Sequence, residues 1–235
     1  DKFVLNENLI NAKTKLLINN LKFEEALKLN SPIIDEKIQF NPFNGLIRGN
    51  NRSGKQDTMS IKEFLEKTVV IQNELEKNPK SVMDNYLFAN ALYNLSYFGN
   101  SNILTTVYRS VYSFNDYDLQ KEKIELAIKH YTIALNEATE KEFKAKITYM
   151  LAKTELALFD INYSTKTQDY YNKDFSRYDL ERYWFYNNEE VYDKYIKNSY
   201  GKYFDMLKKD FSNTKYYNEL IHECANLRVY QKHSK

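Results

Sequence analysis

The sequence has few of the residues that bend or interrupt a chain. Its 235 residues include only 5 glycines and 3 prolines, whereas ordinary usage of about 7% and about 5% would supply many more. Folds with many turns depend on both residues, because glycine adopts left-handed backbone angles and proline fixes tight turns. The shortage argues against a turn-rich β fold and favours long helices.

Other features are also scarce or lacking. The single cysteine, Cys224, excludes an internal disulfide and a thiolate-rich zinc site. No apolar run approaches the roughly 20 residues that a membrane-spanning helix needs. Lysine and arginine number 34 against 32 acidic residues, for a net charge of +2, and a protein that binds phosphates non-specifically is usually far more basic. We therefore expect no cofactor, no metal and no nucleic-acid partner.

Apolar residues at helical spacing are abundant, and hydrophobic residues make up 43% of the chain. The capping pair Ser60 and Glu63 predicts the start of one helix, and Asn78-Pro79 predicts its end. No segment shows the sustained alternation of a strand, so the predicted fold is all-α. Helices are predicted at 5–29, 60–77, 86–98, 103–112, 119–138, 142–159, 189–208 and 214–230. An irregular loop over 39–57 lies between the first and the second of these helices.

Two stretches carry the spacing of small and aromatic residues that is typical of paired, stacked helices. They are Tyr86-x2-Ala89-Asn90-x2-Tyr93 and Ala127-x3-Tyr131-x2-Ala134. The spacing predicts a solenoid of tetratricopeptide-like (TPR-like) helix hairpins over a single domain, residues 1–235. The second stretch comes about 25 residues later than a strict 34-residue unit allows, so the repeat is irregular. A compact helical bundle is the alternative.

The sequence resembles the tetratricopeptide-like region of large, poorly characterised lipoproteins of Bacteroidota. The resemblance rests on Asn41-Pro42-Phe43 and on the segments 89–100, 141–153 and 211–224. It implies a helical-repeat scaffold on the cell envelope, as an outer-membrane lipoprotein or in the periplasm, within a larger assembly such as secretion or transport machinery. Because the chain starts at Asp1, we expect a signal sequence or a longer N-terminal portion, with a possible lipid anchor as the only membrane association.

Two motifs suggest chemistry only weakly, and we predict no catalytic residue. Gly49 to Lys55 fits part of a phosphate-binding loop, but Gln56 occupies the position of the magnesium-binding hydroxyl. His222-Glu223-Cys224 offers three ligand types, but helix neighbours two residues apart point to different faces. We expect Cys224 to lie in the core with Leu220, Ile221 and Leu227. An enzyme is thus the least favoured class of protein.

The strongest candidate for function is an aromatic segment from Tyr163 to Phe204, which holds 14 aromatic residues. Rings with polar tips suit protein-binding hot spots, sugar stacking or base stacking, but they also fill helical cores. We predict a non-enzymatic scaffold that binds protein partners, with a glycan-binding surface lipoprotein of nutrient uptake as the alternative. The predicted partner-binding residues are Tyr170, Tyr171, Tyr178, Tyr183, Trp184 and Tyr186.

Overall fold

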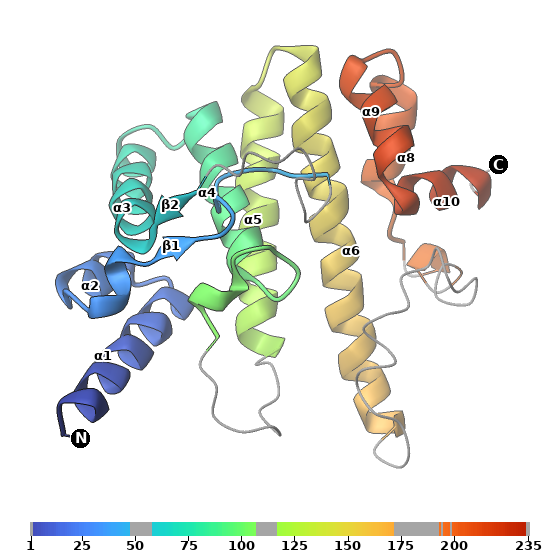
Figure 1. Cartoon of the computed structure of the whole chain (residues 1–235). Helices are drawn as coiled ribbons and strands as arrows, with labels where there is room; N and C mark the ends of the chain where they lie inside the picture. The colour runs from blue at the N-terminus through green and yellow to red at the C-terminus, as the bar shows by residue number, and fades with distance from the viewer. Residues whose placement is uncertain are drawn as a thin grey trace. The chain divides into compact units, whose positions relative to one another are not determined.

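The structure is a computed structural model that describes residues 2–47, 58–106, 117–171, 193, 195–197 and 199–233. The described residues are mostly helical, which confirms the all-α prediction (Figure 1). The chain divides into two compact units, which we call unit 1 (Asp1–Ala134) and unit 2 (Leu135–Lys235). The expected single domain over 1–235 stays a prediction.

Unit 1 is built around a group of helices with one very short sheet. Strands β1 (Lys37–Ile38) and β2 (Met59–Ser60) pair antiparallel, with Lys37 opposite Ser60 and Ile38 opposite Met59. Helix α3 packs on both α2 and α4 (Figure 1). The helices are α1 (Lys2–Asn19), α2 (Phe23–Lys28), η1 (Pro32–Asp35), α3 (Ile61–Lys77), α4 (Val82–Leu95), η2 (Asn102–Leu104) and most of α5 (Tyr117–Glu137).

The predicted start of α3 is confirmed in detail. Ser60 Oγ accepts from the Glu63 backbone N–H at 3.1 Å, and a Glu63 carboxylate oxygen accepts from the Ser60 N–H at 2.6 Å. This reciprocal pair satisfies two backbone donors that the first helical turn leaves open. The helix ends before Pro79, with Asn78 as its C-cap. Its buried face consists of Ile61, Phe64, Leu65, Thr68 and Ile71, whereas Val69 and Leu75 are half-buried.

The prediction of one helix over 5–29 is wrong, because the chain breaks between α1 and α2. Leu21 adopts a left-handed conformation with φ of 59°. Its N–H donates to the Ile18 carbonyl at 3.0 Å, and the Lys22 N–H donates to the Leu17 carbonyl at 2.9 Å. These two bonds form a Schellman-type helix end, a position that glycine usually occupies. Apolar Leu21 fits the helical pattern and so conceals the turn from sequence reading.

Helix α4 starts and ends earlier than the predicted 86–98. Ser81 caps it, with its hydroxyl accepting from the Asp84 N–H, and the helix ends at Leu95. The chain then turns back on the helix end, so that a Cβ at Gly99 would overlap the Asn94 backbone. Gly99 is needed for this close approach. The predicted helix at 103–112 is described only to 106, where η2 is a single 3-10 turn.

Unit 2 consists of α6 (Lys141–Tyr171), α8 (Lys202–Asp210), α9 (Lys215–Glu223) and α10 (Ala225–His233), with α8 and α9 packing on α6 (Figure 1). Two predicted helices are interrupted. The one over 189–208 breaks at Ser199 and Gly201, which have φ of 63° and 105°. The one over 214–230 breaks at Cys224, whose extended backbone separates α9 from α10.

Candidate functional site

Four of the six predicted partner-binding residues lie outside the described part of the chain. Tyr170 and Tyr171 are the last residues of α6. Tyr178, Tyr183, Trp184 and Tyr186 fall outside the described residues. A partner-binding surface on these side chains therefore stays a prediction.

The described end of the aromatic segment forms part of the core of unit 2. Tyr195 is fully buried and stacks on Tyr200, with ring centroids 5.4 Å apart. Phe159 of α6 meets both rings edge-on, at 5.2 Å from each. Phe204 is also buried and lies 5.1 Å from the ring of Tyr230. For these residues the core-filling interpretation holds.

A buried carboxylate anchors the turn that precedes α8. Glu155 of α6 is 6% exposed, and one of its oxygens accepts from the Tyr195 hydroxyl at 3.1 Å and from the Gly201 N–H at 2.9 Å. Burial raises the pKa of the Glu155 carboxyl, while these hydrogen bonds and Lys202 act in the opposite sense. Because these donors belong to the same unit as Glu155, the hydrogen bonds hold the turn before α8 against α6.

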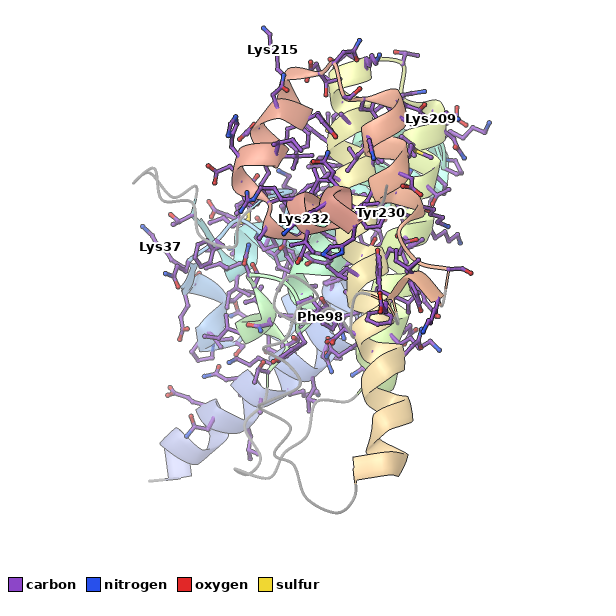
Figure 2. The ribbon with its side chains drawn as sticks, turned by 90° about the vertical axis from the view of Figure 1, so that its right-hand side faces the viewer. Lys37, Phe98, Lys209, Lys215, Tyr230 and Lys232 are labelled. Atoms are coloured by element: carbon purple, nitrogen blue, oxygen red, sulfur yellow. The ribbon has the colours of Figure 1, made fainter. Side chains whose placement is uncertain are left out.

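Charged side chains of α6 lie near both ends of α9. The Glu142 carboxylate accepts from the Lys215 and Tyr216 N–H groups at 2.8 and 3.1 Å, which lowers the pKa of Glu142. Figure 2 labels Lys215 at this helix end, where its side chain is exposed. Lys153 interacts with Cys224 at the other end, and burial lowers the pKa of Lys153 to about 8. A carboxylate at the start and an ammonium near the end both suit the helix dipole.

Neither weak motif gains support as a site. Gly49 to Lys55 lies outside the described residues. Cys224 is buried between Leu220 and Leu227, as predicted, whereas Ile221 is half-buried and His222 is exposed. Within the described ranges, no group of three or more His, Cys, Asp or Glu side chains could hold a metal ion.

In unit 1, the two stretches with small and aromatic spacing contact each other. Tyr131 of α5 is fully buried, and its hydroxyl donates to Asn90 Oδ1 of α4 at 2.5 Å. The Tyr131 ring lies 6.0 Å from the ring of Tyr86. Ala89 and Ala127 are both fully buried. Since early residues of α4 meet late residues of α5 and the Tyr97 N–H reaches Gln120, the two helices are antiparallel.

The loop that follows β1 contains a compact turn at residues 41–44, which we call the Asn-Pro-Phe turn. The Asn44 N–H donates to the Asn41 carbonyl at 3.1 Å. The Phe43 N–H donates to the Asn41 side-chain oxygen at 2.9 Å. The turn is therefore closed by its own backbone and by an Asx bond, a common role of asparagine before proline.

Two buried asparagines of α4 bind the carbonyl groups of this turn. Asn90 Nδ2 donates to the Phe43 carbonyl at 2.7 Å. Asn94 Nδ2 donates to the Pro42 and Asn44 carbonyls at 2.8 and 3.0 Å. Both asparagines are 4% exposed or less. Three successive carbonyls that the turn itself leaves open are thus satisfied by side-chain amides.

A third asparagine of α4, Asn85, fixes the state of His130 on α5. Asn85 Nδ2 donates to the Pro79 and Ser81 carbonyls, so its oxygen faces His130 Nδ1 at 2.7 Å. An amide oxygen only accepts, so Nδ1 carries the proton. Burial and the neighbouring Lys129 lower the pKa of His130 to about 4, which keeps the ring neutral at pH 7.

Sequence analysis missed these asparagines as a group. Asn90 and Asn94 lie in the segment 89–100 that carries the resemblance, whereas Asn85 lies outside it, and no buried partner was predicted for any of the three. A signal was available, because α4 is otherwise strongly apolar and places three amides at positions 85, 90 and 94. Amides in an apolar helix require hydrogen-bond partners when they are buried. The partners of Asn90 and Asn94 in the chain segment after β1 lie 47 to 52 residues away, so the local pattern does not identify them.

Comparison with known proteins gives no relative for this chain. No family model matches it, and no curated protein or solved structure is significantly similar to it. Among the helices that the structure describes, none is both long and apolar enough to cross a membrane.

Proposed function

We propose that the chain is a non-enzymatic, TPR-like scaffold that mediates protein–protein interaction within a cell-envelope assembly. The observation that supports this best is the antiparallel contact of α4 and α5. Tyr131 meets both Tyr86 and Asn90, and Ala89 and Ala127 are fully buried. Tyrosines between helices that approach at small residues are typical of stacked hairpins, which expose long faces for partners.

Three titratable groups with shifted pKa values are each bonded to groups of their own unit. Glu142 and Glu155 accept from backbone N–H groups that begin helices or precede them. His130 is bonded to Asn85 and packs edge-on against Phe88 at 4.9 Å. Each group has a structural task inside its own unit. The location in the cell envelope of Bacteroidota rests on the sequence resemblance alone.

Co-purification followed by direct binding tests this function. The chain, expressed in its native membrane context, should retain a protein that also binds the purified chain in calorimetry. Trp184→Ala and Tyr183→Ala should weaken that binding at least about tenfold, as expected for aromatic hot spots, with unchanged helical circular dichroism. Ile103→Ala, at a side chain that is 64% exposed in unit 1, serves as the matched control and should bind normally.

Two results would contradict the proposal. Specific glycan binding that Trp184→Ala removes, without any bound protein, would favour the glycan-binding alternative. Loss of helical signal in Trp184→Ala would assign that side chain to the core.

A further inference from the structure

The Asn-Pro-Phe turn ends at an asparagine that is followed by glycine. Of the 5 glycines in the chain, only Gly45 follows an asparagine, Asn44. In such a pair the side-chain amide lies within reach of the next backbone nitrogen, and glycine has no Cβ to shield that nitrogen or restrict its movement. The pair can therefore lose ammonia through a five-membered succinimide ring, which water opens to leave a carboxyl group.

The bonds of the turn hold the Asn44 backbone but leave the two reacting groups open. The Asn44 N–H donates to the Asn41 carbonyl at 3.1 Å, and the Asn44 carbonyl accepts from Asn94 Nδ2 at 3.0 Å. Within the described ranges, neither the Asn44 side-chain amide nor the Gly45 N–H forms a hydrogen bond. Both residues are half-buried, so each keeps some contact with water.

The amide of Asn94 is oriented so that its nitrogen faces the reacting peptide bond. Asn94 Oδ1 accepts from the Asn100 N–H at 3.4 Å. Asn94 Nδ2 donates to the Pro42 carbonyl as well as to that of Asn44. Since Asn94 is 4% exposed, its donor is fixed beside the Asn44 carbonyl oxygen before any reaction begins.

The oxygen that Asn94 binds carries negative charge when the backbone nitrogen becomes reactive. Once the Gly45 N–H loses its proton, resonance within the peptide unit spreads the charge onto the Asn44 carbonyl oxygen. A donor at 3.0 Å from this oxygen stabilises the anion more than the neutral peptide, because hydrogen bonds to charged acceptors are stronger. The bond from Asn94 therefore favours the form of the nitrogen that attacks.

We propose that Asn44 is a site of self-catalysed deamidation that Asn94 promotes. The Gly45 nitrogen gives its proton to solvent and bonds to Asn44 Cγ. The Cγ–Nδ2 bond then breaks, and the amide nitrogen takes up a proton and leaves as ammonia. Water opens the succinimide at Cγ to give aspartate, or at the backbone carbonyl carbon to give isoaspartate. The net change replaces an amide by a carboxylate and consumes water, without an oxidant or a reductant.

The reaction changes unit 1 where the turn joins the rest of the loop. Both products place a negative charge at residue 44. In the isoaspartate product the oxygen that Asn94 binds becomes part of a free carboxylate, and the main chain gains one carbon before Gly45. The inference goes beyond the proposed scaffold function, because the modification requires no partner.

The test follows residue 44 in the folded full chain at pH 7.5 by peptide mapping with mass spectrometry, using fragmentation that separates aspartate from isoaspartate. The reference is a blocked synthetic peptide with the sequence of residues 40–47. Two matched variants separate the chemistry from the fold. Asn94→Leu removes the donor to the reacting peptide bond, whereas Asn90→Leu removes the neighbouring bond to the Phe43 carbonyl and leaves that donor in place.

The folded chain should convert Asn44 at least as fast as the peptide. Asn94→Leu should slow the conversion by about tenfold, since one hydrogen bond to a charged group is lost. Asn90→Leu loosens the same turn and should not slow it. Asn44→Gln keeps an amide but would need a six-membered ring, so residue 44 should stay unmodified in that variant.

Slower conversion in the folded chain than in the peptide would overturn the proposal, because the fold would then protect the site. An unchanged or faster rate in folded Asn94→Leu would overturn it as well. If Asn94→Leu does not fold, the comparison of the unaltered chain with the peptide decides. None of these measurements involves a partner, so their outcome is separate from that of the proposed function.

Discussion

The two units bury titratable groups that respond to acid in opposite directions. Unit 1 keeps His130 neutral against Asn85, and burial lowers the pKa of this ring to about 4. Unit 2 buries the Glu155 carboxyl under Tyr195 and Gly201, and burial raises its pKa. In both units the titratable group is bonded to a second helical segment. The pKa shifts differ in direction because burial disfavours the positive charge of His130 and the negative charge of Glu155.

Two units of one helical chain can therefore change in stability in opposite directions as the pH falls. A base with a lowered pKa stabilises the fold above its unfolded pKa, and that contribution is lost as the pH falls through the folded value. An acid with a raised pKa contributes stability at low pH that is lost as the pH rises through the folded value. Between pH 6.5 and 4.5, unit 1 should therefore weaken while unit 2 gains.

The largest expected effect comes from Asn90→Ala in unit 1. The change removes the partner of the Tyr131 hydroxyl and of the Phe43 carbonyl, both in the core. We expect a loss of about 3 kcal/mol in the free energy of unfolding of unit 1, measured by urea titration with hydrogen exchange of α4. Because an amide does not titrate, the loss should be equal at pH 7.5 and pH 5. Asn73→Ala, at an exposed position of α3, should change little.

In unit 2, Glu155→Ala should cost about 2 kcal/mol at pH 7, because the Tyr195 hydroxyl and the Gly201 N–H lose their acceptor. Glu155→Gln keeps an acceptor oxygen and should cost much less. It should also abolish the gain in stability that the unaltered unit shows as the pH falls towards 4.5. Hydrogen exchange of α8 measures both. A loss of protection in unaltered unit 2 over that range would contradict the comparison.

His130 tests the opposite sign in unit 1. A pKa of about 4 in place of 6.5 corresponds to about 3 kcal/mol for a fully buried ring, and partial exposure reduces this to about 1–2 kcal/mol. Unit 1 should lose this stability as the pH falls from 6.5 to 4. His130→Asn retains a donor to Asn85 and should make the stability of unit 1 nearly constant over that range. An unchanged slope in this variant would assign the acid response to another group.

The smallest effect is expected from Glu142→Gln, in α6, which alters the acceptor at the start of α9. Its pKa is lowered by the Lys215 and Tyr216 N–H groups, so its contribution is present above pH 4.5 and lost as the pH falls through the lowered value. The side chain is accessible to solvent, so only the first turn of α9 should exchange faster. Exchange across α8 should stay as it is, which separates this local effect from that of Glu155.

Local signals explain which parts of the fold could be predicted. The Ser60–Glu63 box lies within four residues. The burial of Cys224 was expected from its apolar neighbours Leu220 and Leu227, although Cys224 itself ends α9 instead of continuing a helix. The turn at Leu21 could not be predicted, because an apolar residue occupies a left-handed position. The roles of Asn90 and Asn94 depend on residues 47 to 52 positions away. The spacing of residues within a helix does not indicate partners at such a distance in the sequence. The predicted surface from Tyr170 to Tyr186 stays a prediction.

The bonds between α4 and the Asn-Pro-Phe turn also bear on the order of folding. Each closes a loop of about fifty residues, whose entropic cost must be met before the contact stabilises the chain. The hairpin of α3 and α4 forms from contacts closer in sequence, so it should assemble first. Asn94→Ala should then accelerate unfolding far more than it slows folding. The turn would then dock late in folding, onto helices already formed, and would slow the unfolding of unit 1.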